Sequence, residues 1–131
     1  MISIAEMKEL AEKEKELDKV KYEKDLAQYR DKLNKVKPKL MEYIEKCIYN
    51  GIKNNSKIGL YTSHIENIFK YGDDVLYYLA NPNRKDVSAY EVALRELANE
   101  VREELFNAGV KAIIKNENSC CMGEPYLFLE V

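Results

Sequence analysis

Tryptophan is absent from the 131 residues, and the chain has only one histidine, three cysteines, three prolines and five glycines. A structural zinc site needs four Cys or His ligands at set spacings, and the one histidine and three cysteines of this chain lack those spacings. No run of about eighteen apolar residues occurs, so the sequence predicts no membrane-spanning helix. A strong charge of one sign is lacking too, because the net charge is −2. A protein that binds nucleic acid through phosphate contacts usually has an excess of basic residues.

Nucleotide and nucleophile motifs are also missing from the sequence. It contains no G-x-x-x-x-G-K-[ST], G-x-G-x-x-G or G-x-S-x-G pattern, the signatures of phosphate-binding loops and nucleophile elbows. We therefore predict that the protein is not an enzyme and carries no cofactor or metal. The N-terminus becomes charged within eight residues and lacks the apolar stretch of a signal peptide. This predicts a cytoplasmic protein with reduced thiols.

What the chain does have is a long, highly charged N-terminal segment. Ser3 to Glu6 fits a capping box, the reciprocal side-chain pattern that begins a helix. No glycine or proline follows until Pro38, and residues 1–36 hold nine acidic and nine basic side chains. Pairs such as Glu9 and Lys13 have the i,i+4 spacing that supports an exposed helix. The sequence predicts one helix over residues 3–36, which we name the arm (1–36).

The second half of the arm carries a narrow apolar seam. Its members alternate steps of three and four residues, as in a coiled coil or helical hairpin. Upstream, the seam thins to a few apolar residues among charges. We predict self-association through residues 7–36, giving a homodimer; packing on the rest of the chain or on a foreign partner stays open. The candidate interface residues are Leu26, Tyr29, Leu33 and Val36, and the same spacing continues to Leu40.

The rest of the chain, residues 37–131, is predicted to form an α/β head. Lys37-Pro38 predicts a kink or break, because proline disfavours helical geometry at the preceding residue. A second helix would then run from Pro38 to about Tyr49 and end at Asn50-Gly51. The remaining segments are a strand at 57–63, a helix from Ser63 to near Gly72, helices at 75–80 and 89–107, and strands at 110–115 and 126–131. This order predicts an α+β fold with a three-stranded, largely antiparallel sheet covered by helices on one face.

The chemically reactive side chains have ordinary structural explanations. Adjacent Cys120 and Cys121 could be a metal site, a redox pair or residues of a hairpin loop. Metal and redox sites favour C-x-x-C spacing, so we favour the loop, with a vicinal disulfide on oxidation still possible. His64 lies in a second capping-box pattern, and Asp73 or Asp74 is placed to cap the short helix after it.

Two groups of residues suggest binding. The tyrosines Tyr71, Tyr77 and Tyr78 surround a short helix beside the polar loop 81–87, which favours a protein-binding face because tyrosine recurs at interface hot spots. The segment 37–57 interleaves lysines with Tyr43 and Tyr49, which is typical of nucleic-acid contact. Residues 86–104 carry six carboxylates against two arginines and would repel phosphate, so protein binding is the first hypothesis. The lysines of the alternative are Lys37, Lys39, Lys46, Lys53 and Lys57.

The layout as a whole resembles the small orphan α/β proteins of phages and mobile elements of low-G+C bacteria. A charged N-terminal helix, a small α/β head and a C-terminal hairpin carry this resemblance, together with lysine-rich composition. It implies an accessory or inhibitor protein that docks on a larger host or phage protein. The resemblance assigns no role to any individual residue.

Overall fold

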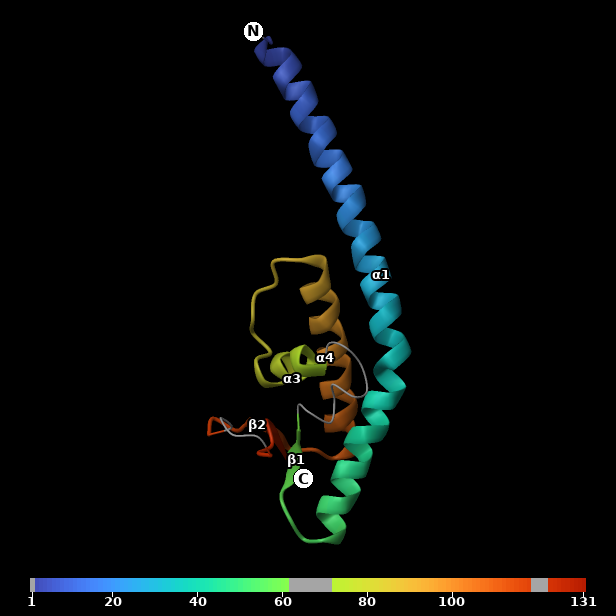
Figure 1. The fold of residues 1–131 in the computed structure, drawn as a ribbon, viewed down its shortest axis with the longest axis vertical. Coiled ribbons are helices and arrows are strands. Elements are labelled where there is room, and N and C mark those ends of the chain that lie inside the picture. The colour runs from blue at the N-terminus through green and yellow to red at the C-terminus, as the bar shows by residue number, and fades with distance from the viewer. Residues whose placement is uncertain (1, 62–71, 119–122) are drawn as a thin grey trace.

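The computed structural model describes residues 2–61, 72–118 and 123–131. Within them the helices are α1 (Ile4–Lys53), α3 (Gly72–Ala80) and α4 (Ala89–Ala108), and the strands are β1 (Ile58–Leu60), β2 (Ala112–Lys115) and β3 (Leu127–Glu130). The predicted α+β fold with a long N-terminal helix is confirmed. Figure 1 shows α1 running past the other elements and continuing alone to the N-terminus. The helix predicted from Ser63 lies outside the described residues.

Helix α1 begins as predicted but ends later. The Ser3 side chain accepts a hydrogen bond from the Glu6 backbone N–H at 3.2 Å, which satisfies one of the free donors at the helix start. The helix then continues for 50 residues, through Pro38. Figure 1 shows its axis bending in the teal stretch that contains this proline. The predicted kink is therefore present, whereas the predicted break and the end near Tyr49 are wrong.

Packing explains why the helix survives Pro38. The proline is exposed, and Leu33, Leu40 and Ile44, on either side of it, are buried in the core. A proline removes one helical hydrogen bond and favours a bend, and here the bend keeps both flanking turns in contact with the core. Gly51 also lies inside the helix. A Cβ atom at this position would collide with Ile58 of β1, which explains why the residue is a glycine. It permits close approach of helix and strand instead of capping the helix.

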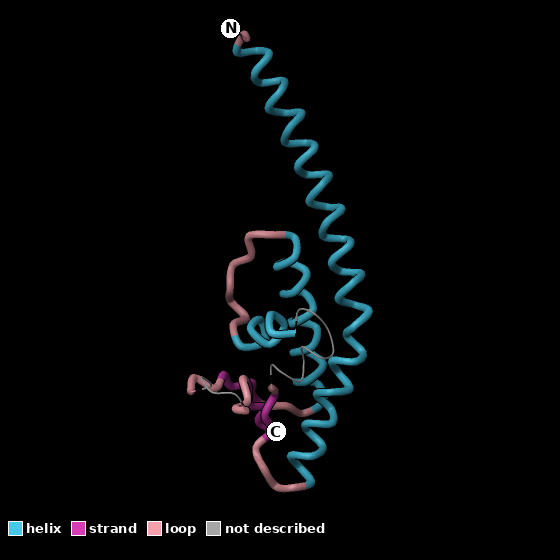
Figure 2. The backbone as a smooth tube through the Cα atoms, viewed as in Figure 1, coloured by secondary structure: helices cyan, strands magenta, loops and turns pink. Residues whose placement is uncertain are grey.

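The three strands form one antiparallel sheet in the order β1-β3-β2. Leu129 of β3 lies between Ile58 and Ile113, and its neighbour Phe128 lies between Gly59 and Ile114. Side chains alternate between faces along a strand, so the first row faces the helices and the second faces away. Leu129 and Ile58 are buried, whereas Ile114 is 48% exposed. The predicted sheet is confirmed (Figure 2), and all three strands are shorter than predicted.

Helix α4 holds more buried residues than either of the other described helices. Ser88 caps its first turn by accepting a hydrogen bond from the Glu91 N–H at 3.2 Å. Gly109 ends it with a φ of 111°, a conformation that glycine adopts at little cost. Its buried face comprises Ala89, Ala93, Leu94, Leu97, Ala98, Val101 and Leu105. Phe106 is 46% exposed, because it lies one position, about 100°, beyond Leu105.

Candidate protein-interaction surfaces

The seam predicted to bind a second subunit is covered by the protein's own helix α4. Leu33 is 3% exposed, and Leu26, Tyr29 and Val36 are partly buried against the same core cluster. The Tyr29 ring meets the Tyr90 ring edge-on, with centroids 5.2 Å apart. These four residues therefore lie in an intrachain interface. The sequence did not reveal this partner surface, because the apolar face of α4 becomes adjacent only after the chain reverses direction.

Ion pairs close the polar edge of the contact between α1 and α4. The Arg30 guanidinium donates two hydrogen bonds to the Glu96 carboxylate, at 2.6 and 2.7 Å. Lys37 Nζ lies 3.0 Å from a Glu104 oxygen and 3.2 Å from a Glu100 oxygen. The hydrogen bond from Arg30 lowers the pKa of Glu96, and the bond to Glu104 is the main cause of a raised pKa at Lys37. We name these contacts the α1–α4 clasp.

The clasp changes the lysine segment that motivated the nucleic-acid alternative. Lys37 is held by two carboxylates, Lys46 pairs with Glu42 at 3.2 Å, and Lys57 lies 5.5 Å from the centroid of the Phe128 ring. Lys39, Lys46 and Lys53 are seven residues apart, so they lie in one row along the outer face of α1. Lys39, Lys46, Lys53 and Lys57 all remain exposed to solvent, whereas Lys37 is partly buried.

The tyrosine cluster separates into a core residue and a surface residue. Tyr78 is 3% exposed, and its hydroxyl donates to Glu91 at 3.1 Å. Burial, followed by the nearby Glu91, raises the pKa of Tyr78 to about 12. Tyr77 instead lies half-buried at the surface, and Tyr71 lies outside the described residues. Tyr78 therefore belongs to the core, and only Tyr77 can be assigned to a surface.

Cations stack on Tyr77 from two different segments of the chain. The guanidinium carbon of Arg84, in the loop after α3, lies 4.7 Å from the Tyr77 ring centroid. Lys115, at the end of β2, places Nζ 5.8 Å from the same ring and 5.9 Å from the ring of Tyr126. Such distances allow cation–π attraction. We name Tyr77, Arg84, Lys115 and Tyr126 the head patch; Arg84, Lys115 and Tyr126 were not predicted, because only the fold brings them to Tyr77.

Two hollows lie on either side of the loop that carries Arg84. One, of about 410 Å³, is lined by Tyr77 and the turn from Ala80 to Arg84. The other, of about 610 Å³, shares Pro82 to Arg84 and extends to Arg95, which pairs with Asp86 at 2.8 Å. Arg102 anchors the end of α3 nearby by donating to the carbonyl oxygens of Tyr78 and Leu79 at 2.9 and 2.8 Å. Tyr77 of the head patch thus lies on a helix whose end is anchored, beside these two hollows.

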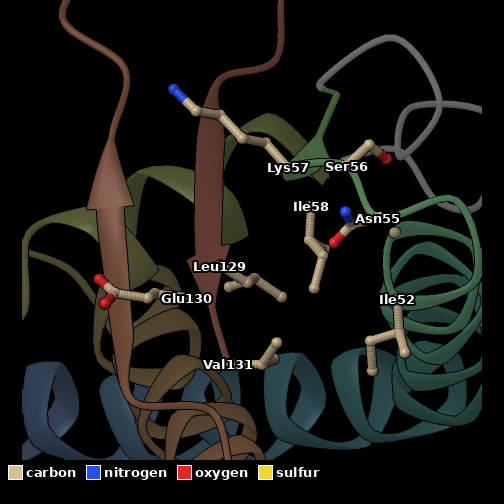
Figure 3. Close-up of a pocket in the computed structure, with 9 residues that line it drawn as sticks. Ile52, Asn55, Ser56, Lys57, Ile58, Leu129, Glu130 and Val131 are labelled. Atoms are coloured by element: carbon tan, nitrogen blue, oxygen red, sulfur yellow. The ribbon is translucent and has the colours of Figure 1, made fainter.

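A third hollow, of about 460 Å³, lies where the end of α1 meets the sheet. Figure 3 shows Ile58, Leu129, Val131 and Ile52 around its centre, while Lys57 and Glu130 point outward. Catalysis needs polar groups that converge on one point, and the labelled polar side chains at this hollow diverge. We assign no chemistry to it.

The remaining reactive groups offer little chemistry where the structure describes them. Cys47 is a free thiol, and burial raises its pKa, which makes it a poor nucleophile at neutral pH. Asp74 is exposed and accepts a hydrogen bond from the Tyr90 hydroxyl at 2.9 Å. Among the described residues, no three His, Cys, Asp or Glu side chains are grouped to hold a metal ion. His64, Cys120 and Cys121 lie outside this part of the chain.

The first half of α1 is the most exposed part of the molecule. Every side chain from Ile4 to Lys24 is exposed, and this stretch, which we name the exposed arm, extends well beyond the other elements (Figure 2). Leu10 is 50% and Leu17 is 70% exposed. Packing against the head begins at Leu26, so the last third of the predicted arm is not available as a free surface.

Compared with known proteins, the chain matches no family model, no curated protein sequence and no solved structure. None of the described helices is apolar over a long enough stretch to cross a membrane. Only the surfaces of this molecule therefore bear on its function.

Proposed function

We propose that the chain is a non-enzymatic, cytoplasmic accessory or inhibitor protein of the phage or mobile-element type, which docks on a larger protein through the head patch. The observation that carries the proposal is the stacking of Arg84 and Lys115 on the Tyr77 ring. Tyrosine and arginine dominate interface hot spots because they bring large, rigid contact area together with directional polar groups.

The charges of the head patch indicate an acidic partner surface. Arg84 pairs only at 3.7 Å with Glu91, and Lys115 forms no ion pair within the described residues. A carboxylate from a partner would find cations already ordered on aromatic rings, so little side-chain entropy would be lost on binding. We propose that the partner presents aspartate or glutamate side chains to this patch.

The direct test compares two double variants of the full chain as bait in cells that carry the gene. Tyr77→Ala with Arg84→Glu removes the head patch. Tyr49→Ala with Lys53→Glu makes the same two kinds of change on the outer face of α1, where Tyr49 is 65% exposed. After purification of the captured protein, we expect the first variant to weaken binding at least tenfold and the second to leave it unchanged.

The control variant also tests the alternative function. If the chain is a nucleic-acid-associated regulator that uses the row of Lys39, Lys46 and Lys53, the Lys53→Glu variant should weaken DNA or RNA binding. The affinity should then fall steeply with salt. Our proposal would be contradicted by nucleic-acid binding with that salt slope, together with partner binding that the Tyr77→Ala, Arg84→Glu variant leaves unchanged.

We also propose that the protein forms a homodimer. The interface is the exposed arm, residues 4–24, and does not extend to residue 36 as the sequence predicted. Isolated helices draw most of their stability from packing an apolar face, and the exposed arm has such a face without an intrachain partner in the described residues. Sedimentation should show a concentration-dependent dimer that Leu10→Glu with Leu17→Glu abolishes. Ile4→Glu with Tyr22→Glu, which changes two exposed apolar residues on the other side of the arm, should leave the dimer intact.

A further inference from the structure

Four apolar side chains of the exposed arm form a stripe that is separate from the seam against α4. Met7, Leu10, Leu17 and Val20 are all about half exposed or more. At about 100° per residue, the centre of this stripe lies roughly 130° around the helix axis from the seam that faces α4. A partner helix on the stripe would therefore approach from a side that the head does not cover.

The stripe has a spacing that reads the same in both directions. Steps of three, seven and three residues separate its four members, so the pattern is symmetric about a point between Lys13 and Glu14. When two such helices run in opposite directions about that point, Leu10 meets Leu17 of the second copy and Met7 meets Val20. Each copy then covers the apolar residues of the other.

Two pairs of charges on the same side of the helix follow the same symmetry. Lys13 and Glu14 flank the centre of the stripe, and Glu6 and Lys21 lie near its two ends. In the antiparallel arrangement Lys13 faces Glu14 of the second copy, and Glu6 faces Lys21. A parallel arrangement in register would instead place each of these charges against its own copy, and like charges at such positions destabilise paired helices.

The length of the exposed arm fits this register. The same symmetry places Ser3, the helix N-cap, opposite Lys24, and contact with the head begins at Leu26. The paired region thus uses the whole exposed helix and ends just before the partner's head. No residue of the seam against α4 has to be released.

We infer that two copies of this chain pair antiparallel through their exposed arms, about a two-fold axis between Lys13 and Glu14. This inference rests on the homodimer proposed above and specifies its geometry. It places the two heads at opposite ends of a helical rod, so that the two head patches are separated and each can bind its own acidic partner.

Cysteine cross-linking in the full chain tests the register directly. In a background of Cys47→Ser, Cys120→Ser and Cys121→Ser, Met7→Cys and Val20→Cys are made as separate variants. A disulfide needs Cα atoms within about 7 Å, and thirteen residues of helix separate equal positions of antiparallel copies by roughly 20 Å. We therefore expect a cross-linked dimer when the two variants are mixed under oxidising conditions, and little from either variant alone.

The other outcomes contradict the inference in distinguishable ways. Cross-linking of each variant with itself would indicate a parallel pair and overturn the register while leaving the dimer in place. If the wild-type chain sediments as a dimer but no mixture of the cysteine variants cross-links, the interface lies elsewhere. A wild-type chain that stays monomeric into the millimolar range would overturn both the inference and the proposed dimer, but not the role of the head patch.

A charge-exchange series gives an independent check. Glu14→Lys places two lysines opposite each other in the antiparallel pair and should raise the dimer dissociation constant at least tenfold. Lys13→Glu with Glu14→Lys restores opposite charges across the axis and should bring the constant back to within about threefold of wild type. If the double variant binds as weakly as the single one, the predicted facing of these residues is wrong.

Discussion

Helix α1 contains two regions with the same secondary structure and opposite surroundings. Residues 4–24 hold thirteen charged side chains and are exposed throughout. The equally long stretch 33–53 holds seven charged side chains, and its residues Leu33, Leu40 and Ile44 are buried in the core. Both stretches have an apolar stripe at helical spacing. The difference lies in what faces the stripe: α4 and β1 cover the second region, while nothing in the described chain covers the first.

The comparison shows that helical periodicity predicts a buried face only where the fold supplies a second surface. In the packed region the apolar residues follow each other at nearly every turn, and Arg30 and Lys37 add charge-assisted bonds to α4. In the exposed arm only four stripe residues are spread over four turns, with charges between them. Such a stripe is too sparse for a protein core but suits contact with a second helix of the same kind.

The largest expected difference is between leucine truncations in the two regions. Leu40 is fully buried and Leu17 is 70% exposed. Leu40→Ala should destabilise the protein by about 2–5 kcal/mol because it leaves a cavity. Leu17→Ala should change stability by less than about 0.5 kcal/mol in the monomer. Denaturant melts at low micromolar concentration measure both, and equal effects would show that the arm is packed.

Gly51 allows a test in which the usual effect of a substitution changes sign. Glycine-to-alanine substitutions inside helices normally stabilise by about 0.5–1 kcal/mol. At Gly51 the added methyl group would collide with Ile58, so Gly51→Ala should destabilise by about 1–3 kcal/mol. Asn50→Ala, at the exposed neighbouring position, is the control and should be neutral or slightly stabilising. A stabilised Gly51→Ala protein would mean that α1 and β1 are farther apart than described.

Alkaline pH should weaken the core of the head at Tyr78. Its pKa is raised from 10.0 to about 12 in the folded protein, mainly by burial. A raised pKa means that this contribution to stability is complete below pH 10 and is lost as the pH rises toward 12. The loss should be at most roughly 3 kcal/mol. Stability measured against pH for wild type and Tyr78→Phe checks this, since the variant should lack that portion of the decline.

Acid should weaken the clasp by a smaller amount. The pKa of Glu96 is lowered from 4.5 by its bond to Arg30, so its contribution is present above pH 4.5 and disappears as the pH falls below that value. Arg30 and Glu96 side chains are 49% and 38% exposed, and solvent screening keeps the effect below about 1 kcal/mol. Arg30→Met should remove this acid-dependent component, whereas Lys35→Met, which breaks the exposed pair with Asp31, should not.

The sequence predicted those features that depend on local chemistry. The helix cap at Ser3 and the three strands follow from short patterns of residues, and all are present. The errors concern Pro38 and Gly51, where tertiary contacts override the local preference. The partner of the seam was missed for the same reason, because α4 is distant in the sequence.

The candidate surfaces were predictable only in part. Tyr77 was found from the clustering of tyrosines, and the charged arm from its lack of breakers. Arg84, Lys115 and Tyr126 join Tyr77 only when loop, β2 and β3 are folded together. Lys37 belongs to the lysines of the nucleic-acid alternative, but it is held by carboxylates of α4 that lie more than sixty residues away in the chain.

Residue-resolved hydrogen exchange along α1 tests the contrast between its two regions most directly. At low concentration we expect the backbone amides of residues 29–51 to be protected like those of α4, and those of residues 8–22 to exchange at least about a hundredfold faster. At high concentration the amides of residues 8–22 alone should gain protection as the arms pair. Uniform protection along α1 at low concentration, or an exposed arm that gains none at high concentration, would contradict the account.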